Sequence, residues 1–217
     1  MTAEEKISNP EPIVSTPKGT TISYIIKAMK DVCIPFKKAS TQPDLIFPLN
    51  ENKLTQILVE QLEVKIKSHP FIGVKNQYSD LFFNTKGIPD FYFHIVEEGV
   101  VHEPLFVVES KRLPSQTFVT EYVKGETNNG GIERFKTEKH GKGLSECGMI
   151  GFIEEENFSY WKTSINGWIR DLSQSDNNWK KDEVLTEEEV KSEYRYLKSV
   201  AHTISSGNVI LHHLWIK

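Results

Sequence analysis

The sequence has few of the features that mark several common protein classes. It contains only two cysteines among 217 residues, Cys33 and Cys147, which are too few for a disulfide framework or a four-cysteine zinc site. It has no apolar run long enough to span a bilayer, and its N-terminal stretch lacks the apolar centre of a secretory signal. The G-x-x-x-x-G-K-[ST] loop of nucleotide hydrolases is also missing. These absences predict a protein of the reducing cytoplasm that depends on another protein for any energy coupling to nucleotide hydrolysis.

What the chain does contain is the composition of one globular domain. Hydrophobic residues make up 38% of it, charged residues 26% and aromatic residues 11%, which is enough apolar material for one core. The formal net charge of −4 disfavours non-specific coating of nucleic acid but permits a local basic groove. We expect a mobile, proline-rich tail over residues 1–20, followed by a single domain over residues 21–217.

Residues Asn50–Lys67 show the clearest helical pattern in the chain. Asn50 is a good N-cap, and the apolar stripe consists of Leu54, Ile57, Leu58, Leu62 and Ile66. A helical wheel places Glu51 within roughly 30° of the centre of the stripe made by Leu54, Leu58 and Leu62. A carboxylate there is unusual unless it lies at the helix mouth beside a cation. The alternative is a favourable first-turn charge at a solvated helix end.

The remaining pattern predicts an α/β domain with a central mixed β-sheet flanked by helices. Phe91–Val96 and Pro104–Glu109 are expected to form an antiparallel hairpin. The other expected strands are Cys147–Ile153, Tyr194–Ile204 and Val209–Ile216. Helices are expected over Ile132–His140 and Ser159–Leu172, a strand or short helix over Thr21–Phe36 ending at Pro35, and an exposed loop with a short helix near Thr186 over Ser173–Glu193.

Charged residues stand where the two hairpin strands are expected to begin and end. Asp90 follows Pro89 at the start of the first strand, and Glu109-Ser110-Lys111 closes the second. Residues two apart in a strand share a face, so Glu109 and Lys111 project together, and strand pairing would bring Asp90 alongside. Two carboxylates and a backbone carbonyl make a hard oxygen site suited to Mg²⁺ or Mn²⁺. The alternative is chance spacing, which would arise in roughly a quarter of such chains.

A helix glutamate, Pro-Asp at a strand and Glu-x-Lys on the next strand resemble the PD-(D/E)XK nuclease superfamily. The matching residues are Glu51, Pro89, Asp90, Glu109 and Lys111. The resemblance covers roughly Asn50–Phe152, and the stretch Tyr122–Phe135 is similar to a segment of defence-associated nucleases. It implies a restriction-endonuclease-like core and a metal-dependent endonuclease that hydrolyses DNA. It further implies a role in restriction or phage defence, as a homodimer or with a partner protein.

The resemblance also implies a role for each residue. Asp90 and Glu109 would hold the Mg²⁺ or Mn²⁺ ion with the carbonyl of Ser110, and Lys111 would contact the attacking water and a phosphate oxygen. Glu51 would hold a second metal or orient a metal-bound water. One alternative is a catalytically inactive nucleic-acid-binding or scaffold module of the same fold. Another is an unrelated α/β domain in which Glu109 and Lys111 form only a local ion pair.

Positive charge is concentrated beside this predicted site despite the negative total. Residues 110–142 contain seven Lys and Arg against four acids, whereas residues 143–193 contain five against twelve. The candidate nucleic-acid-binding residues are Lys124, Arg134, Lys136 and Lys139, and the Gly130-Gly131 turn would add backbone N–H groups. The alternative is that these are ordinary solvated helix charges.

Two other groups of residues are better explained by structure than by function. His212 and His213 are adjacent in an expected strand and would point to opposite faces, so they would not ligate one ion together. Trp161 and Trp168 recur at helical spacing with apolar residues, which favours core packing over base stacking.

Overall fold

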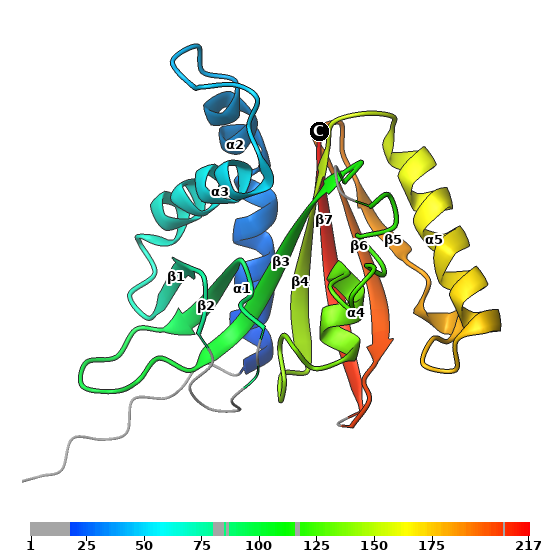
Figure 1. The fold of residues 1–217 in the computed structure, drawn as a ribbon. Helices are drawn as coiled ribbons and strands as arrows, with labels where there is room; N and C mark the ends of the chain where they lie inside the picture. Colours follow the sequence, from blue (N-terminus) through cyan, green and yellow to red (C-terminus); the bar gives the residue numbers. More distant parts are fainter. Residues whose placement is uncertain (1–17, 80–84, 86, 116–117, 206) are drawn as a thin grey trace, which may run out of the picture.

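In a computed structural model of the protein, a seven-stranded sheet lies between two layers of helices (Figure 1). The structure describes residues 18–79, 85, 87–115, 118–205 and 207–217. The strands are β1 (Ile72–Asn76), β2 (Phe91–Ile95), β3 (Pro104–Leu113), β4 (Glu146–Ile153), β5 (Thr186–Val190), β6 (Tyr194–His202) and β7 (Asn208–Ile216). The helices are α1 (Lys18–Asp31), α2 (Cys33–Ser40), α3 (Glu51–Ile66), α4 (Gly131–Lys136) and α5 (Phe158–Ser175), with a 3₁₀ turn η1 (Lys181–Glu183).

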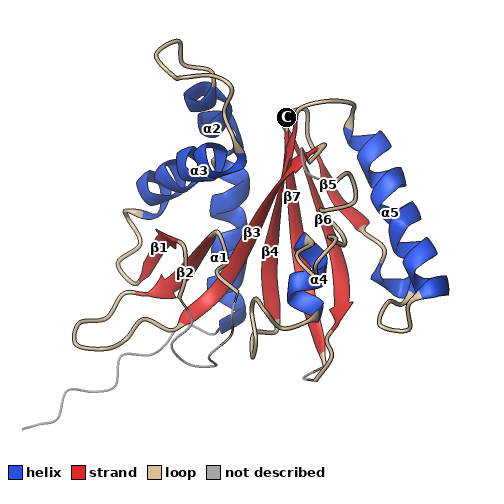
Figure 2. Ribbon diagram, in the orientation of Figure 1, coloured by secondary structure: helices blue, strands red, loops and turns tan. Residues whose placement is uncertain are grey.

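The sheet mixes parallel and antiparallel strands in the order β1-β2-β3-β4-β7-β6-β5. Strands β3, β4 and β7 run parallel in the middle, and antiparallel strands extend the sheet on both sides (Figure 2). The predicted α/β domain with a central mixed sheet and flanking helices is therefore confirmed. Within the described ranges, no helix has both the length and the apolar character needed to cross a bilayer.

Helices α1, α2 and α3 cover one face of the sheet. Their buried side chains, among them Ile25 and Leu62, pack against sheet residues such as Phe93. Residues 21–36, predicted to form a strand or a short helix, are helical in the structure. Helix α1 begins at Lys18, so residues 18–20 do not belong to the predicted tail. Residues 1–17 of the predicted tail lie outside the described part of the chain. Pro35 does not end a helix, because it occupies the first turn of α2, where its missing N–H would have no helical partner.

Helix α3 confirms its predicted bounds and cap. The Asn50 side chain accepts a hydrogen bond from the backbone N–H of Lys53 at 2.9 Å, and the helix starts at Glu51. The buried side chains of α3 include Leu54, Leu58 and Leu62 of the predicted stripe. Because this stripe faces the sheet, the first turn of α3 is held against β3.

Helices α4 and α5 cover the opposite face. Trp161, Ile165 and Ile169 of α5 are buried there, and Trp168 packs against the same cluster, as the helical spacing predicts. Helix α4 ends at Lys136, earlier than predicted, and a turn and loop lead from it through His140 to β4. This loop brings residues of the 131–140 segment back over β3.

Two strands differ from the sequence-based expectation. Thr186–Val190 forms the edge strand β5, where a loop with a helix was predicted, because it pairs antiparallel with β6. Its three consecutive glutamates are tolerated at an edge, where charge also discourages pairing with another chain. The strand β1 was not anticipated, although Ile72 and Val74 alternate with less buried neighbours.

Candidate functional site

The candidate site lies where β3 runs on beyond the end of its partner β2. The pairing of these strands ends with Phe91 opposite Val108, whereas β3 continues to Leu113. The predicted site residues Glu109 and Lys111 therefore lie inside a long strand and not at its tip. On one side they are supported by β4, which pairs with β3 as far as Leu113. The other edge of β3 is open to side chains.

Two of the predicted acids occupy that open edge. The backbone N–H of Ser110 donates to Asp90 Oδ2 at 2.6 Å, and the backbone N–H of Arg112 donates to Glu51 Oε2 at 3.1 Å. Alternate N–H groups of a strand point to the same edge, so the spacing of Ser110 and Arg112 explains why both acids meet β3 there. The carboxylates thus take the places that a neighbouring strand would otherwise fill.

Lys111 links the helix to the strand. Its Nζ donates to Glu51 Oε1 at 3.0 Å and lies 3.0 Å from Glu109 Oε1. Burial by itself would lower the pKa of Lys111, but the carboxylates of Glu109, Glu51 and Asp90 outweigh it and raise that pKa. The ammonium is therefore firmly charged, and Glu51 lies at the helix mouth beside a cation, where the stripe on α3 places it.

The pKa values of Asp90 and Glu109 are shifted in opposite directions. Burial raises the pKa of Asp90 to about 7, and the negative charge of Glu109 adds to this effect. Burial also disfavours ionised Glu109, but its interactions with His140, Lys111 and Arg134 outweigh burial and lower its pKa to about 2. At neutral pH the pair therefore carries one firm negative charge and one carboxylate that is ready to exchange a proton for a cation.

The segment that includes α4 supplies two basic groups to Glu109. Arg134 Nη1 lies 3.1 Å from Glu109 Oε1, and His140 Nδ1 lies 3.2 Å from Glu109 Oε2. The sequence-based interpretation missed His140 altogether and assigned Arg134 to phosphate binding. No local pattern marks these contacts, because they depend on how the α4 segment packs over β3.

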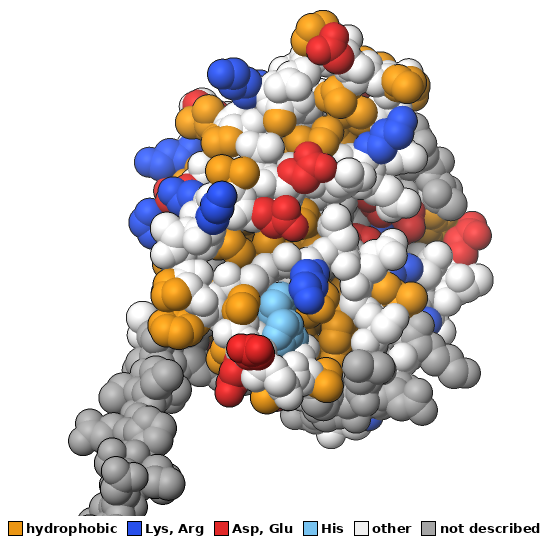
Figure 3. All heavy atoms as spheres, turned by 90° about the vertical axis from the view of Figure 1, so that its left-hand side faces the viewer, with side chains coloured by type: hydrophobic (Ala, Val, Ile, Leu, Met, Phe, Trp, Pro, Cys, Tyr) orange, Lys and Arg blue, Asp and Glu red, His pale blue; other side chains and the backbone are white. Residues whose placement is uncertain are grey.

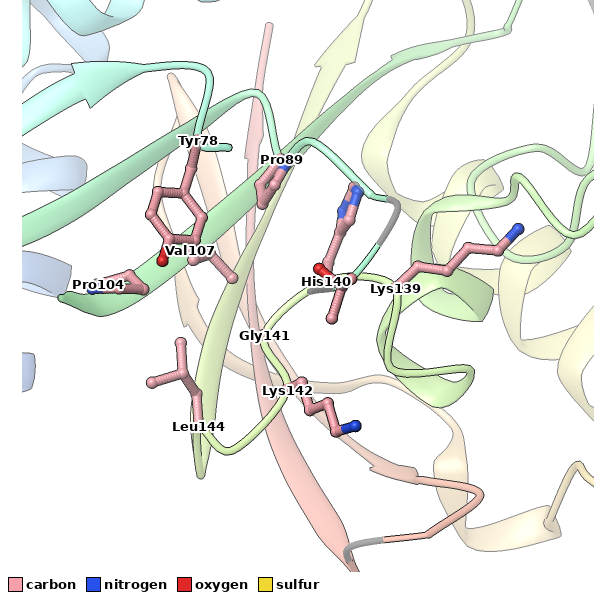
Figure 4. A pocket seen from close by; sticks show the side chains of 10 residues that line it. Tyr78, Pro89, Pro104, Val107, Lys139, His140, Gly141, Lys142 and Leu144 are labelled. Carbon is pink, nitrogen blue, oxygen red and sulfur yellow. The ribbon is translucent and has the colours of Figure 1, made fainter. Parts of the chain in front are cut away.

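His140 is buried and lines a small cavity with Pro89 and Tyr78 (Figure 4). The cavity volume of about 20 Å³ is room for one water molecule. Pro89 directly precedes Asp90, so this cavity connects the α4 segment to the chain that carries the second carboxylate. Gly87 lies against the same histidine, and a Cβ there would come within 2.4 Å of the ring of His140.

The predicted nucleic-acid-binding lysines have different surroundings. Lys124 forms an ion pair with Asp176 at 2.9 Å, and Lys139 donates to the carbonyl of Asn128 at 2.7 Å, both in partly exposed positions. Lys136 is buried, forms an ion pair with Glu183 and donates to the carbonyl of His202 at 3.1 Å. Lys136 is thus not placed to contact a polyanion, because its face of α4 turns inward toward β6.

The predicted glycine turn is also occupied from within. The N–H groups of Gly125 and Gly130 each donate to Glu133 Oε2 at 3.2 Å, and the N–H of Gly131 donates to the carbonyl of Glu121. The buried carboxylate of Glu133 takes the position that a phosphate was expected to take. The turn is therefore an internal anion site, filled by the protein's own side chain.

The C-terminal histidines point to opposite faces of the sheet, as predicted. His212 Nε2 lies 2.7 Å from Glu146 Oε2, while His213 lies 2.8 Å from both the Tyr122 hydroxyl and Ser199 Oγ. Burial lowers the pKa of His213 to about 3, so this ring stays neutral. These histidines are hydrogen-bonded parts of the core.

A metal ion would find two acidic side chains from the strands at this site. Among the described residues, no group of three or more His, Cys, Asp and Glu side chains is arranged to hold a metal ion. Mg²⁺ commonly takes one or two protein carboxylates and completes its shell with water and substrate phosphates. In donor type and number, Asp90 and Glu109 match that mode of binding and do not match a closed structural zinc site. In this structure, the Glu109 oxygens face Lys111, Arg134 and His140. The predicted part of the Ser110 carbonyl stays a prediction.

Comparisons with protein-family models, with curated proteins and with solved structures found no match to this chain. The resemblance to the PD-(D/E)XK superfamily therefore stays a prediction, and the function is argued from the site itself.

Proposed function

We propose that the protein is a metal-dependent nuclease of the PD-(D/E)XK type that hydrolyses DNA phosphodiester bonds. The observation that carries this proposal is the convergence of four charged side chains around one stretch of β3, two on its face and two at its open edge. They come from a helix, from the start of one strand and from the middle of the next, and they are Glu51, Asp90, Glu109 and Lys111. A local ion pair between Glu109 and Lys111 would not require Asp90 or Glu51.

The chemistry assigned to each residue follows from its charge state. Asp90 and Glu109 would hold Mg²⁺ or Mn²⁺, which when bound would acidify a water molecule and stabilise charge on the phosphate. Asp90 releases its proton readily near neutral pH, so a cation would find an ionised oxygen there. Lys111 stays charged and would donate to a phosphate oxygen. Glu51 holds the Lys111 ammonium in place and would orient a water molecule.

One observation favours a second candidate, a nucleic-acid-binding module that does not cut. Arg134 and His140 lie against the two oxygens of Glu109, and the Arg134 guanidinium supplies a positive charge there without any metal. If these contacts persist when nucleic acid is bound, Glu109 cannot serve as a ligand. Arg134 is partly exposed, however, and also donates from Nε to the carbonyl of Asn129 at 3.1 Å, so a phosphate could replace Glu109 as the partner of its other nitrogens.

The setting of the protein belongs to this proposal as well. The two cysteines are free and buried, which suits a reducing cytoplasm. A restriction or phage-defence role, a homodimer and a partner protein are carried by the family resemblance alone.

The decisive experiment is incubation of the purified protein with plasmid and single-stranded DNA in Mg²⁺, Mn²⁺ or EDTA. We expect cleavage with either metal and none in EDTA. The variants Asp90→Asn and Lys111→Met should each lower the rate by roughly 10²–10³-fold, since each removes charge stabilisation in the transition state.

The matched control is Glu63→Gln, an exposed acid on the same helix as Glu51, which should cleave like the wild type. Cleavage that survives both site variants would contradict the assignment. Binding of DNA without cleavage in any metal would identify the binding module instead.

A further inference from the structure

We propose that a pocket next to the candidate site binds an unpaired nucleobase, so that the substrate carries an unpaired base beside the phosphate that is cut. This inference rests on the proposed nuclease function and names the substrate class for that same site. The pocket has a volume of about 480 Å³ and is lined by Phe47, Pro48, Leu49, Leu54, Arg112 and Glu154. Its walls come from the α2–α3 connection, from α3 and from the ends of β3 and β4.

The pocket lies next to the charged site at the start of α3. Leu49 and Leu54 stand on either side of Glu51 in the chain, and the backbone N–H of Arg112 donates to the carboxylate of Glu51. Arg112 follows Lys111 along β3, so their side chains leave opposite faces of the sheet, Lys111 toward α4 and Arg112 toward the pocket on the α3 side. The two faces meet at the open edge of β3, where Glu51 contacts both residues, so a nucleotide bound around this edge with its phosphate near Lys111 would bring its base to the pocket.

The exposed surface here has the chemistry of a stacking site. Phe47 is 56% exposed and Ile46 is 81% exposed, although both are large apolar side chains. Figure 3 shows hydrophobic side chains gathered at the top of the molecule, where Figure 1 places the α2–α3 connection. An exposed aromatic ring beside a phosphate-binding site suits a nucleobase, because every base has a flat face that stacks on such a ring.

The rim of the pocket is polar and planar. The Arg112 guanidinium binds the Glu154 carboxylate through both Nε and Nη2, so the two groups form one flat pair at the edge of the pocket. The Glu154 side chain is 32% exposed and can accept from a base amino group. A base has the same combination of apolar faces and a polar edge, which distinguishes it from an apolar peptide side chain.

The pairing state of the base follows from the same geometry. In an intact duplex, both faces of each base are covered by its neighbours and its pairing edge is occupied. To bind a base in this pocket, Phe47 would have to contact one face of the base while the Arg112–Glu154 pair contacts its edge. Only a base that has left the stack, in a single strand or at an unpaired position of a duplex, offers both.

The test is binding of fluorescein-labelled DNA to the full chain carrying Asp90→Asn, measured by fluorescence anisotropy so that cleavage plays no part. The probes are a single strand, a perfect duplex, a duplex with one bulged base and the same duplex with an abasic bulge. We expect the single strand and the base-containing bulge to bind several-fold more tightly than the perfect duplex and the abasic bulge.

Adding Phe47→Ala to this protein should weaken binding of the bulged probe by roughly tenfold, which lies within the range for stacking of one base on an aromatic side chain. Binding of the abasic probe should not change. Phe47→Tyr should restore binding, whereas Phe47→Leu, which keeps an apolar side chain without the ring, should not. The matched control is Phe71→Ala, because Phe71 is 50% exposed and lies beyond the other end of α3.

The outcomes separate this inference from the proposed function. Equal binding of all four probes, or no effect of Phe47→Ala, would overturn the base pocket, and a protein partner or a second copy of the chain would then be the better occupant. Failure of every probe to bind would overturn both proposals. Loss of metal-dependent cleavage in the nuclease assay, with base-selective binding retained, would overturn only the nuclease.

Discussion

Two buried charge clusters stand on the α4 side of the sheet, and they are built differently. In the first, Lys136 forms an ion pair with Glu183. The Glu183 carboxylate also accepts hydrogen bonds from the backbone N–H groups of His202 at 2.8 Å and Lys180 at 2.9 Å. In the second, Lys111 serves two carboxylates, and three basic side chains approach Glu109 at 3.0–3.2 Å. Within the described residues, neither Glu109 oxygen has a hydrogen bond of good geometry.

This difference indicates a structural role for the first cluster and a functional role for the second. The cluster around Lys136 pairs opposite charges one to one and satisfies the backbone as well, which is how a buried ion pair avoids a net cost. The cluster around Glu109 leaves Asp90 with a pKa raised to about 7 beside Glu109, whose pKa is lowered to about 2. Such displaced pKa values mark sites with a task more often than sites of pure support.

The largest effect we expect is on the free energy of unfolding, when the cluster around Lys136 is altered. Lys136→Met should lower the free energy of unfolding by about 3–5 kcal/mol, because it leaves the Glu183 carboxylate buried and unpaired. The double variant Lys136→Met with Glu183→Leu should recover only part of that loss, since it removes the unpaired charge but leaves the backbone N–H groups of His202 and Lys180 without their acceptor. Urea denaturation followed by circular dichroism measures both. If the double variant is no more stable than the single one, the cluster is not a simple pair.

A divalent metal should stabilise the protein only through the cluster around Glu109. At a Mg²⁺ concentration 100 times its dissociation constant, the free energy of unfolding should rise by about 2.7 kcal/mol, because the ion binds the folded state. The effect should disappear in Asp90→Asn and persist in Lys136→Met. Thermal unfolding with and without EDTA gives the comparison. A metal effect that survives Asp90→Asn would place the ion elsewhere.

The smallest expected effect is on the pH dependence of stability. Asp90 has its pKa raised from 3.8 to about 7 by folding, so the folded state binds the extra proton between these values. Its contribution therefore makes metal-free protein less stable as pH rises from about 4 to about 7, by about 1–2 kcal/mol after screening. Glu109 contributes in the opposite sense, since its stabilisation is lost as pH falls from 4.5 toward about 2.

Asp90→Asn should remove the decline between pH 4 and 7 and leave the loss at lower pH. Denaturation midpoints measured at half-unit pH steps would show this, with Glu63→Gln as the exposed acid that leaves the profile unchanged. An unaltered slope in Asp90→Asn would mean that Asp90 is better solvated than its position indicates.

The parts of the site that the sequence predicts are those set within a single element. Strand periodicity puts Glu109 and Lys111 on one face, and helical periodicity puts Glu51 at the sheet-facing mouth of α3. The hairpin prediction then brings Asp90 beside β3. The first two placements depend only on residues a few positions apart, so local pattern is sufficient for them, and the hairpin predicts only that Asp90 lies near β3, not which group it contacts.

Other contacts were not predicted because they depend on how separate elements pack. Lys136, Arg134 and His140 belong to one short segment that reads as basic and solvated. In the fold, Lys136 turns inward to Glu183, while Arg134 and His140 lie against Glu109. Nothing within the segment distinguishes these directions.

The amino-acid sequence by itself determined the mixed α/β class, the capped helix α3, the β2–β3 hairpin and the shared face of the acid and the lysine. The periods of helices and strands are local properties, and they survive any arrangement of the elements. Only the tertiary structure decided that β3 extends beyond the end of β2, that two acids cap its open edge, and that the segment including α4 lies against Glu109. Those contacts join residues 20 to 61 positions apart, and their geometry depends on register and packing that no single stretch of chain contains.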